Sequence, residues 1–241
     1  MIDKTRGIVL HQLKYTDSGI IVWIYTRKYG RNSFILKGAR NKKQGKHNIF
    51  FQPLSVLDMV VYLKESREIN SIKEFSAAYI PSDIYLNVKK SGVAIFLGEV
   101  LSAVLKEETP NEVLFDFIEN GITYFDTNYE GYANFHISFL SGLLSYLGFE
   151  PTTGKNIADT YFDMLNGIFT ASPPAHEYIA DKEVSAILAR FFTSSYEEAN
   201  KIILNGAMRN IVLDNLIRYY SLHLPGLKNI KSLRVLKEVY G

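Results

Sequence analysis

The sequence has 241 residues, of which 47% are hydrophobic and 22% charged, a composition typical of a globular protein and not of a disordered chain. It contains no cysteine, which excludes a disulfide framework, a thiolate zinc site and a cysteine nucleophile. No stretch approaches the roughly 18 uncharged apolar residues of a membrane span, and the first residues lack the pattern of a secretory signal, so a cytoplasmic protein is expected.

The net charge of +2 conceals an asymmetry along the chain. Residues 1–80 hold 14 Lys and Arg against 6 Asp and Glu, whereas residues 81–241 hold 13 against 19. An excess of positive charge in one part of a chain indicates an anionic partner for that part, although a solvated surface with segregated charges is the simpler alternative. The charge break coincides with a change in hydrophobic periodicity, which favours the partner.

The first 80 residues are predicted to form strands. Short runs rich in β-branched and aromatic residues alternate with turn formers, and the runs cover 7–13, 20–26, 33–37, 54–63 and 68–75. Five short strands in about 75 residues suit a small closed barrel, because closure removes exposed strand edges. An SH3-like barrel or a small open sheet packed on helices remains an alternative.

From Pro81 onward the apolar period becomes helical. Two capping boxes are predicted, at 109–112 and 195–198, and Gly148 is predicted to end a helix in the left-handed conformation. Residues 149–180 are irregular, with a short hairpin possible over 161–169. The sequence therefore predicts an α+β protein of two domains: a five-stranded barrel over 1–80 and an all-α domain over 81–241 with an irregular insertion.

One segment between two predicted strands, residues 37–46, is strongly basic and contains no acid. Such a loop can reach several phosphates at once, which gives sequence-independent and salt-sensitive binding. The alternative is an exposed loop that lysines keep soluble. Nearby aromatic and basic residues favour nucleic acid, and Trp23 and Tyr25 are each equally compatible with the barrel core and with its surface. The predicted DNA-binding residues are Tyr15, Tyr25, Arg27, Arg31, Phe34, Lys37, Arg40, Lys42, Lys43 and Lys46.

Catalytic signals are weak. The five histidines are scattered and show no metal-ligand spacing, and neither the GxxxxGK[ST] phosphate loop nor GxGxxG occurs. We therefore expect a protein that is not an enzyme and that needs no metal or cofactor.

Three sets of motifs together resemble the RecO family of recombination mediators. The first set is N-terminal and comprises 7–10, Tyr15 with 17–22, 26–30 and 37–40. The second is Tyr-Phe-Asp-Met-Leu-Asn-Gly-Ile-Phe at 161–169. The third comprises 219–224 and 231–236. The three sets occur in the family's order and span essentially the whole chain.

The resemblance implies an N-terminal OB fold, a helical C-terminal domain and a non-enzymatic role in recombinational DNA repair. RecO-like proteins bind single- and double-stranded DNA and anneal complementary strands. They also help RecR to load RecA onto DNA coated by single-strand-binding protein, whose acidic C-terminal tail they engage, so the protein would be nucleoid-associated.

This sequence departs from many family members in one respect, because residues 149–180 lack the four cysteines of their zinc module. We expect the insertion to be metal-free and held by apolar residues, namely Tyr161, Phe162, Leu165, Ile168 and Phe169.

Basic residues of the second part are candidates for binding the acidic tail. They are Lys89, Lys90, Lys106, Arg190 and Arg209. Two other functions fit the same pattern: a protein adaptor that docks on single-strand-binding protein, and an RNA-binding OB protein. Loss of tail binding in loop variants would identify the adaptor, and preference for RNA in competition would identify the RNA-binding protein.

Overall fold

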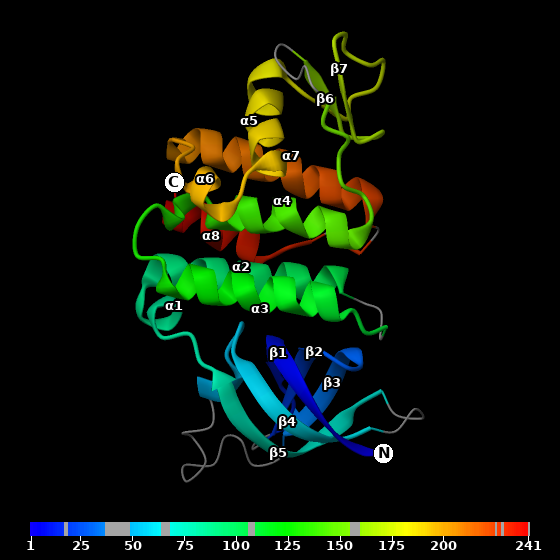
Figure 1. The fold of residues 1–241 in the computed structure, drawn as a ribbon, viewed down its shortest axis with the longest axis vertical. Helices are drawn as coiled ribbons and strands as arrows, with labels where there is room; N and C mark the ends of the chain where they lie inside the picture. The colour runs from blue at the N-terminus through cyan, green and yellow to red at the C-terminus, as the bar shows by residue number, and fades with distance from the viewer. Residues whose placement is uncertain are drawn as a thin grey trace. The chain divides into compact units, whose positions relative to one another are not determined.

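The chain forms two compact units in its computed structural model. The described residues are 1–16, 19–36, 49–63, 68–105, 109–154, 160–224, 226–227 and 229–240. One unit comprises Met1–Thr127 with Ile230–Leu236, and the other comprises Asn128–Asn229 with Lys237–Gly241 (Figure 1). The first unit therefore extends past residue 80, because three helices pack with the barrel. The domain boundary that the sequence places at residue 80 stays a prediction.

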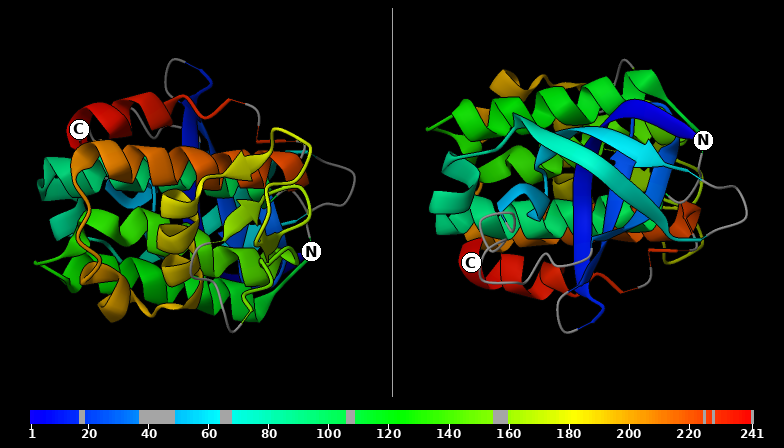
Figure 2. Two further views of the ribbon diagram at one scale, coloured as in Figure 1. Left: turned by 90° about the horizontal axis from the view of Figure 1, so that it is seen from above. Right: turned by 90° about the horizontal axis from the view of Figure 1, so that it is seen from below.

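Five strands close a barrel in the first unit. They are β1 (Ile2–Lys14), β2 (Ile20–Thr26), β3 (Gly30–Leu36), β4 (Val56–Tyr62) and β5 (Asn70–Tyr79). Their order is β1-β2-β3-β5-β4; β1 pairs with both β2 and β4, and the β3–β5 pairing is parallel. The right panel of Figure 2 looks onto these strands. A five-stranded barrel followed by helices confirms the predicted fold class.

The barrel is buried on its inside and on part of its outside. Side chains from every second position of β2, such as Val22 and Ile24, join Val9, Phe34 and Leu57 in the interior core. Successive strand residues point to opposite faces. Outward residues of β1 and β2, such as Leu10 and Tyr25, are buried as well.

Three helices of the first unit follow the barrel: α1 (Asp83–Leu86), α2 (Val88–Val104) and α3 (Glu112–Thr127). Helix α2 packs against β1, where Leu10 is almost fully buried. The ring of Tyr25, on β2, stacks on Phe115 of α3 with centroids 6.1 Å apart. The helices therefore supply a second apolar layer over part of the barrel wall.

The predicted capping box at 109–112 is wrong. Helix α3 begins at Glu112, and the side chain of Asn111 accepts a hydrogen bond from the amide of Leu114 at 3.0 Å. Asn111 directly precedes the first helical residue, where an Asn side chain reaches the third amide of the helix. Thr109 lies too early in the chain for this role.

The helices of the second unit are η2 (Tyr132–Asn134), α4 (Phe135–Leu147), α5 (Lys182–Thr193), α6 (Tyr196–Asn200) and α7 (Gly206–His223), and the last helix, α8 (Ser232–Tyr240), has residues in both units. Helix α4 is buried around most of its circumference, so it is the central helix of its unit. Two predictions are confirmed here: Gly148 caps α4 with φ +82°, and Ser195 forms a capping box with Glu198.

The insertion contains a small sheet, so the second part of the chain is not wholly helical. Its strands are β6 (Tyr161–Asp163), β7 (Ile168–Thr170) and β8 (Ile179–Ala180), in the order β7-β6-β8. The hairpin predicted over 161–169 is therefore confirmed. Phe162 is buried and stacks on Phe169 at 4.9 Å. Leu165, in the turn between β6 and β7, and Ile168, the first residue of β7, are exposed, which corrects their predicted packing role.

A buried carboxylate organises that turn. Asp163 accepts hydrogen bonds from the amides of Leu165 and Asn166 at 3.0 and 3.1 Å and from the Asn166 side chain at 2.7 Å. Its oxygen also lies 3.2 Å from His176. Burial acts to raise the pKa of Asp163, but the bonds from Asn166 outweigh it and hold that pKa below its ordinary value of 3.8.

Asp163→Ala is expected to lower the free energy of unfolding of the second unit by about 1–2 kcal/mol, because two amides and a side-chain amide lose a charged acceptor. The folded-state pKa of Asp163 is depressed, so this difference should be complete above about pH 4 and shrink as the pH falls further. Urea denaturation at pH 7 and pH 3 measures it. Asp163→Asn, which keeps one acceptor oxygen, should lose less, and equal losses at both pH values would contradict the assignment.

Candidate nucleic-acid interface

One part of the barrel wall combines exposed aromatic, apolar and basic side chains. Across β1, β2 and β3 the register places His11 opposite Trp23 and Leu13 opposite Ile21. Directly opposite residues share a face of the sheet, and the interior residues Val22 and Ile24 fix this face as the outer one. His11 is exposed and Leu13 is 53% exposed. We call His11, Leu13, Trp23, Ser33 and Ile35 the outer strip; Ser33 and Ile35 continue the two rows on β3.

The outer strip lies close to Leu36, the last residue of β3 and the residue before the basic segment in the sequence. The register Lys14–Ile20–Leu36 puts the last residue of β3 next to the β1–β2 end. Lys14 is exposed, and Tyr15 is 56% exposed. Of the predicted loop cations, Lys37, Arg40, Lys42, Lys43 and Lys46 lie outside the described residues.

Two of the three predicted aromatic residues are wrong as base platforms. Phe34 is 0% exposed and belongs to the interior core, and Tyr25 is 2% exposed beneath α3. A ring with no accessible face cannot stack on a base. Burial also raises the pKa of Tyr25 to about 12. Tyr15 alone of the three lies at the surface.

Arg27 is held by carboxylates of α3. Its guanidinium donates to both oxygens of Asp116 at 2.6 and 3.1 Å and to Glu112 at 3.2 Å, and it lies 5.6 Å from the centroid of the Phe115 ring. Hydrogen bonding to Asp116 raises its pKa further. The predicted phosphate contact stays a prediction, and a DNA phosphate at this place would compete with two acids for the Arg27 charge.

Arg31 points outward from β3 and donates a hydrogen bond to the carbonyl of Ser102, in α2, at 2.9 Å. It lies one register position beyond Ser33 of the outer strip, since Arg31 pairs with Tyr25 and Ser33 pairs with Trp23. Its predicted role in DNA binding stays open. The hydrogen bond to α2 holds the Arg31 guanidinium. The basic track that would join Arg31 to Arg27 stays a prediction.

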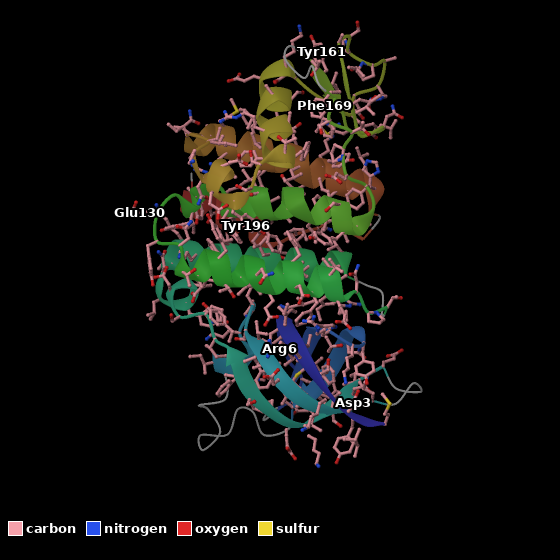
Figure 3. All side chains as sticks on the ribbon, in the orientation of Figure 1. Asp3, Arg6, Glu130, Tyr161, Phe169 and Tyr196 are labelled. Atoms are coloured by element: carbon pink, nitrogen blue, oxygen red, sulfur yellow. The ribbon has the colours of Figure 1, made fainter. Side chains whose placement is uncertain are left out.

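A second concave region, of about 530 Å³, has cations and acids mixed on its walls. It lies over β1, β4 and β5 and is lined by Lys4, Thr5, Arg6, Arg27, Lys28, Asp58, Met59, Val60, Glu74, Phe75 and Ser76. Arg6, labelled in Figure 3, pairs with Asp58 at 2.9 Å and with Glu119 at 3.0 Å. The lining holds four cations and two acids, and Glu119 also pairs with Arg6, so part of the positive charge of this groove is neutralised within the protein.

The region beside that groove is held by Asp3, also labelled in Figure 3. Tyr29 donates a hydrogen bond to its carboxylate at 2.5 Å, and Lys28 pairs with it at 3.0 Å. These bonds lower the pKa of Asp3 to about 2. Lys28 is thus another barrel cation with an intramolecular acid partner.

The predicted tail-binding cations fall into different environments. Lys89 and Arg190 are exposed on α2 and α5, and Lys106 lies outside the described residues. Lys90 is wrong as a candidate, because its side chain is 0% exposed. The Arg209 guanidinium already makes hydrogen bonds within the protein. It donates to the Asn134 side chain at 3.0 Å and to the carbonyl of Leu204 at 2.8 Å.

The histidine and carboxylate side chains in the described parts of the chain bear on the expected absence of a metal site. Among those residues, no group of three His, Cys, Asp or Glu side chains could hold a metal ion. The metal-free insertion stays a prediction. No helix that the structure describes is long and apolar enough to cross a membrane.

Sequence reasoning left the place of Trp23 open and did not single out Lys14 or the other residues of the outer strip. Strand parity was the available signal, because residues two apart on a strand share a face. Parity alone, however, does not say which face is inside. The interior core decides this, and it places Trp23 on the outside.

Comparisons with known proteins give a consistent result. The family described as "Recombination protein O N terminal" matches residues 1–80, and "Recombination protein O C terminal" matches residues 86–234. The chain is 36% identical to the DNA repair protein RecO of Phocaeicola vulgatus and of Bacteroides fragilis, and 30% identical to that of Porphyromonas gingivalis. Each of these matches covers 100% of both chains.

Proposed function

Because the chain belongs to the RecO family of DNA repair proteins, we propose that it binds single- and double-stranded DNA through the barrel end that carries residues 37–46. The observation that carries this proposal is the charge of that segment together with the position of Leu36, the residue before it. The segment holds five Lys and Arg and no acid. Leu36 pairs with Ile20, which in turn pairs with the exposed Lys14, next to the exposed Tyr15. Other barrel cations, such as Arg6 and Arg27, already have acid partners.

The proposed activities are the annealing of complementary DNA strands and the mediation of recombination. Neutralising the phosphates of two strands would let complementary strands approach, which needs no catalytic group. By the family resemblance, the protein would help RecR to load RecA onto DNA coated by single-strand-binding protein. The exposed Lys89 and Arg190 are the proposed contacts for the acidic tail of that coating protein.

Binding to mixed-sequence single-stranded DNA should weaken steeply as salt rises. Changing Arg40, Lys42 and Lys43 together to glutamine should reduce the slope of log affinity against log salt by about 2, because each phosphate contact on a single strand contributes about 0.7. Fluorescence anisotropy of end-labelled DNA over a salt series measures this slope.

A charge-matched control comes from the same barrel. Changing Lys4, Lys28 and Lys73 to glutamine removes the same net charge at exposed positions of β1, the β2–β3 turn and β5, and it should change the slope much less. An unchanged slope in the loop variant would show that the loop is not the contact. Absence of salt-sensitive binding by the unaltered protein would remove the proposed function itself.

A further inference from the structure

Trp23 and His11 form an aromatic pair on the outer wall of the barrel. Their rings are stacked with centroids 5.5 Å apart and an interplanar angle of 27°. They are opposite residues of the adjacent strands β2 and β1, so the backbone pairing fixes their separation. His11 is exposed and Trp23 is partly exposed.

The pair does not belong to the barrel interior. The interior positions of β2 are Ile20, Val22 and Ile24, which alternate with Trp23. On its other side Trp23 faces Ser33, whose small side chain covers little of an indole ring. A large ring in this place contributes little to the interior core, and it gives the sheet a flat, partly accessible aromatic surface.

We infer that the Trp23–His11 pair is a stacking platform for the bases of single-stranded DNA. Every base has a π-face, so stacking on such a platform is tolerant of sequence. This inference rests on the proposed function and assigns to one site a task that the basic segment cannot perform. The cations of 37–46 neutralise phosphates, whereas the platform holds bases.

An apolar residue and a lysine follow the pair along the strand register. Leu13 continues the row along β1, and alternate residues of a strand lie about 6.8 Å apart on one face. Lys14 and Leu36, the residue that precedes the basic segment in the sequence, lie at the end of this row.

One acid lies near the pair, but its carboxylate is already engaged. Glu99 of α2 lies close enough to His11 to interact electrostatically with it. Its oxygens accept hydrogen bonds from the amides of Lys231 and Ser232 at 2.9 and 2.8 Å and from the Ser232 hydroxyl at 2.5 Å. Although burial opposes the shift, these bonds hold the pKa of Glu99 below its usual value. Glu99 is therefore committed to the first turn of α8.

The sequence contains a single tryptophan, so the indole emission of the protein reports on Trp23 alone. Mixed-sequence single-stranded DNA with an end label is titrated with the protein at low salt, and label anisotropy is recorded. A parallel titration with unlabelled DNA follows tryptophan emission. The inference predicts quenching that saturates at the same DNA concentration as the anisotropy change.

Trp23→Ala should weaken binding about 5- to 150-fold, the loss expected for one stacked base, and should leave the salt slope unchanged. Trp23→Phe keeps a ring and should lose only a small part of that affinity. Tyr62→Ala is the matched control, because Tyr62 is an exposed aromatic residue of the same barrel that pairs with Ile2, at the other end of β1. It should bind as the unaltered protein does.

The outcomes separate the platform from the proposed function. If anisotropy reports binding while tryptophan emission stays constant, the platform is wrong, the outer strip is left to a protein partner, and DNA binding by the barrel stands. If anisotropy reports no binding, the proposed function fails, and the platform fails with it. Thermal unfolding by circular dichroism shows whether Trp23→Ala folds. If it does not, the quenching of the unaltered protein and the affinity of Trp23→Phe decide the question.

Discussion

Replacing Lys90 by methionine is expected to lower the free energy of unfolding of the first unit by about 3–5 kcal/mol. Methionine keeps much of the length and apolar volume of the lysine stem, so the loss reports the ammonium group and not a cavity. Urea denaturation followed by Trp23 fluorescence measures the change, because Trp23 lies in the same unit.

The physical reason is a buried polar cluster that joins three helices. The Lys90 ammonium, on α2, lies 2.5 Å from the Asp83 carboxylate of α1 and donates to the carbonyls of Phe125 and Asp126 in α3 at 2.7 and 3.2 Å. The Lys90 side chain has no exposed surface. Removing the ammonium leaves a carboxylate and two carbonyls without their charged donor in a site of low dielectric constant.

Lys89→Met is the matched control, since Lys89 is the exposed neighbour on the same helix. It should change the free energy of unfolding by less than about 0.5 kcal/mol. The double variant Lys90→Met with Asp83→Asn should recover part of the loss, because it removes the unpaired carboxylate. Equal effects of Lys89→Met and Lys90→Met would contradict a structural role for the cluster.

Gly98→Val is expected to destabilise the first unit by about 2–3 kcal/mol. A Cβ atom at position 98 would lie 2.4 Å from the carbonyl oxygen of Leu10 and 3.2 Å from the Cβ of Pro53. The first of these is a backbone atom of β1, so it cannot move aside as the end of a flexible side chain could. Helix α2 would have to move away from β1, which would open the apolar layer between them.

The sign of the change in the free energy of unfolding caused by Gly98→Ala separates two effects. Alanine favours a helix over glycine by about 1 kcal/mol, so Gly98→Ala would be stabilising if helix propensity decided the outcome. We expect it to be destabilising instead, because the clash involves Cβ itself. Ile95→Val, on the exposed side of the same helix, should stay within about 0.5 kcal/mol. Stabilisation by Gly98→Ala in urea denaturation would rule out the close approach.

The strands and the family were predictable because both depend on local pattern. Period-two runs bounded by turn formers located all five barrel strands, and the family resemblance drawn from three sets of motifs is confirmed. Local chemistry also fixed the Gly148 cap and the capping box at Ser195. The prediction failed at Thr109, because Asn111, two residues later, caps α3 instead.

The candidate site was less predictable, because charge and ring chemistry do not reveal what a side chain contacts. Nothing in the sequence distinguishes Arg27 and Lys90 from other cations. The partner of Arg27, Asp116, lies 89 positions away, and that of Lys90, Asp83, lies 7 positions away. Similarly, Phe34 and Trp23 are both aromatic residues of barrel strands. Phe34 lies in the barrel interior, whereas Trp23 lies on the outer wall.

The sequence by itself determined that a basic β-rich part precedes an acidic helical part, that residues 37–46 carry the densest positive charge, and that no cysteine is available for zinc. Each of these properties is set by composition or by short-range periodicity. Only the tertiary structure decided which cations are neutralised, because ion pairs such as Arg27–Asp116 join residues of different elements. It also decided which aromatic rings are exposed, because barrel closure and the packing of α2 and α3 bury one face of each strand and part of the other.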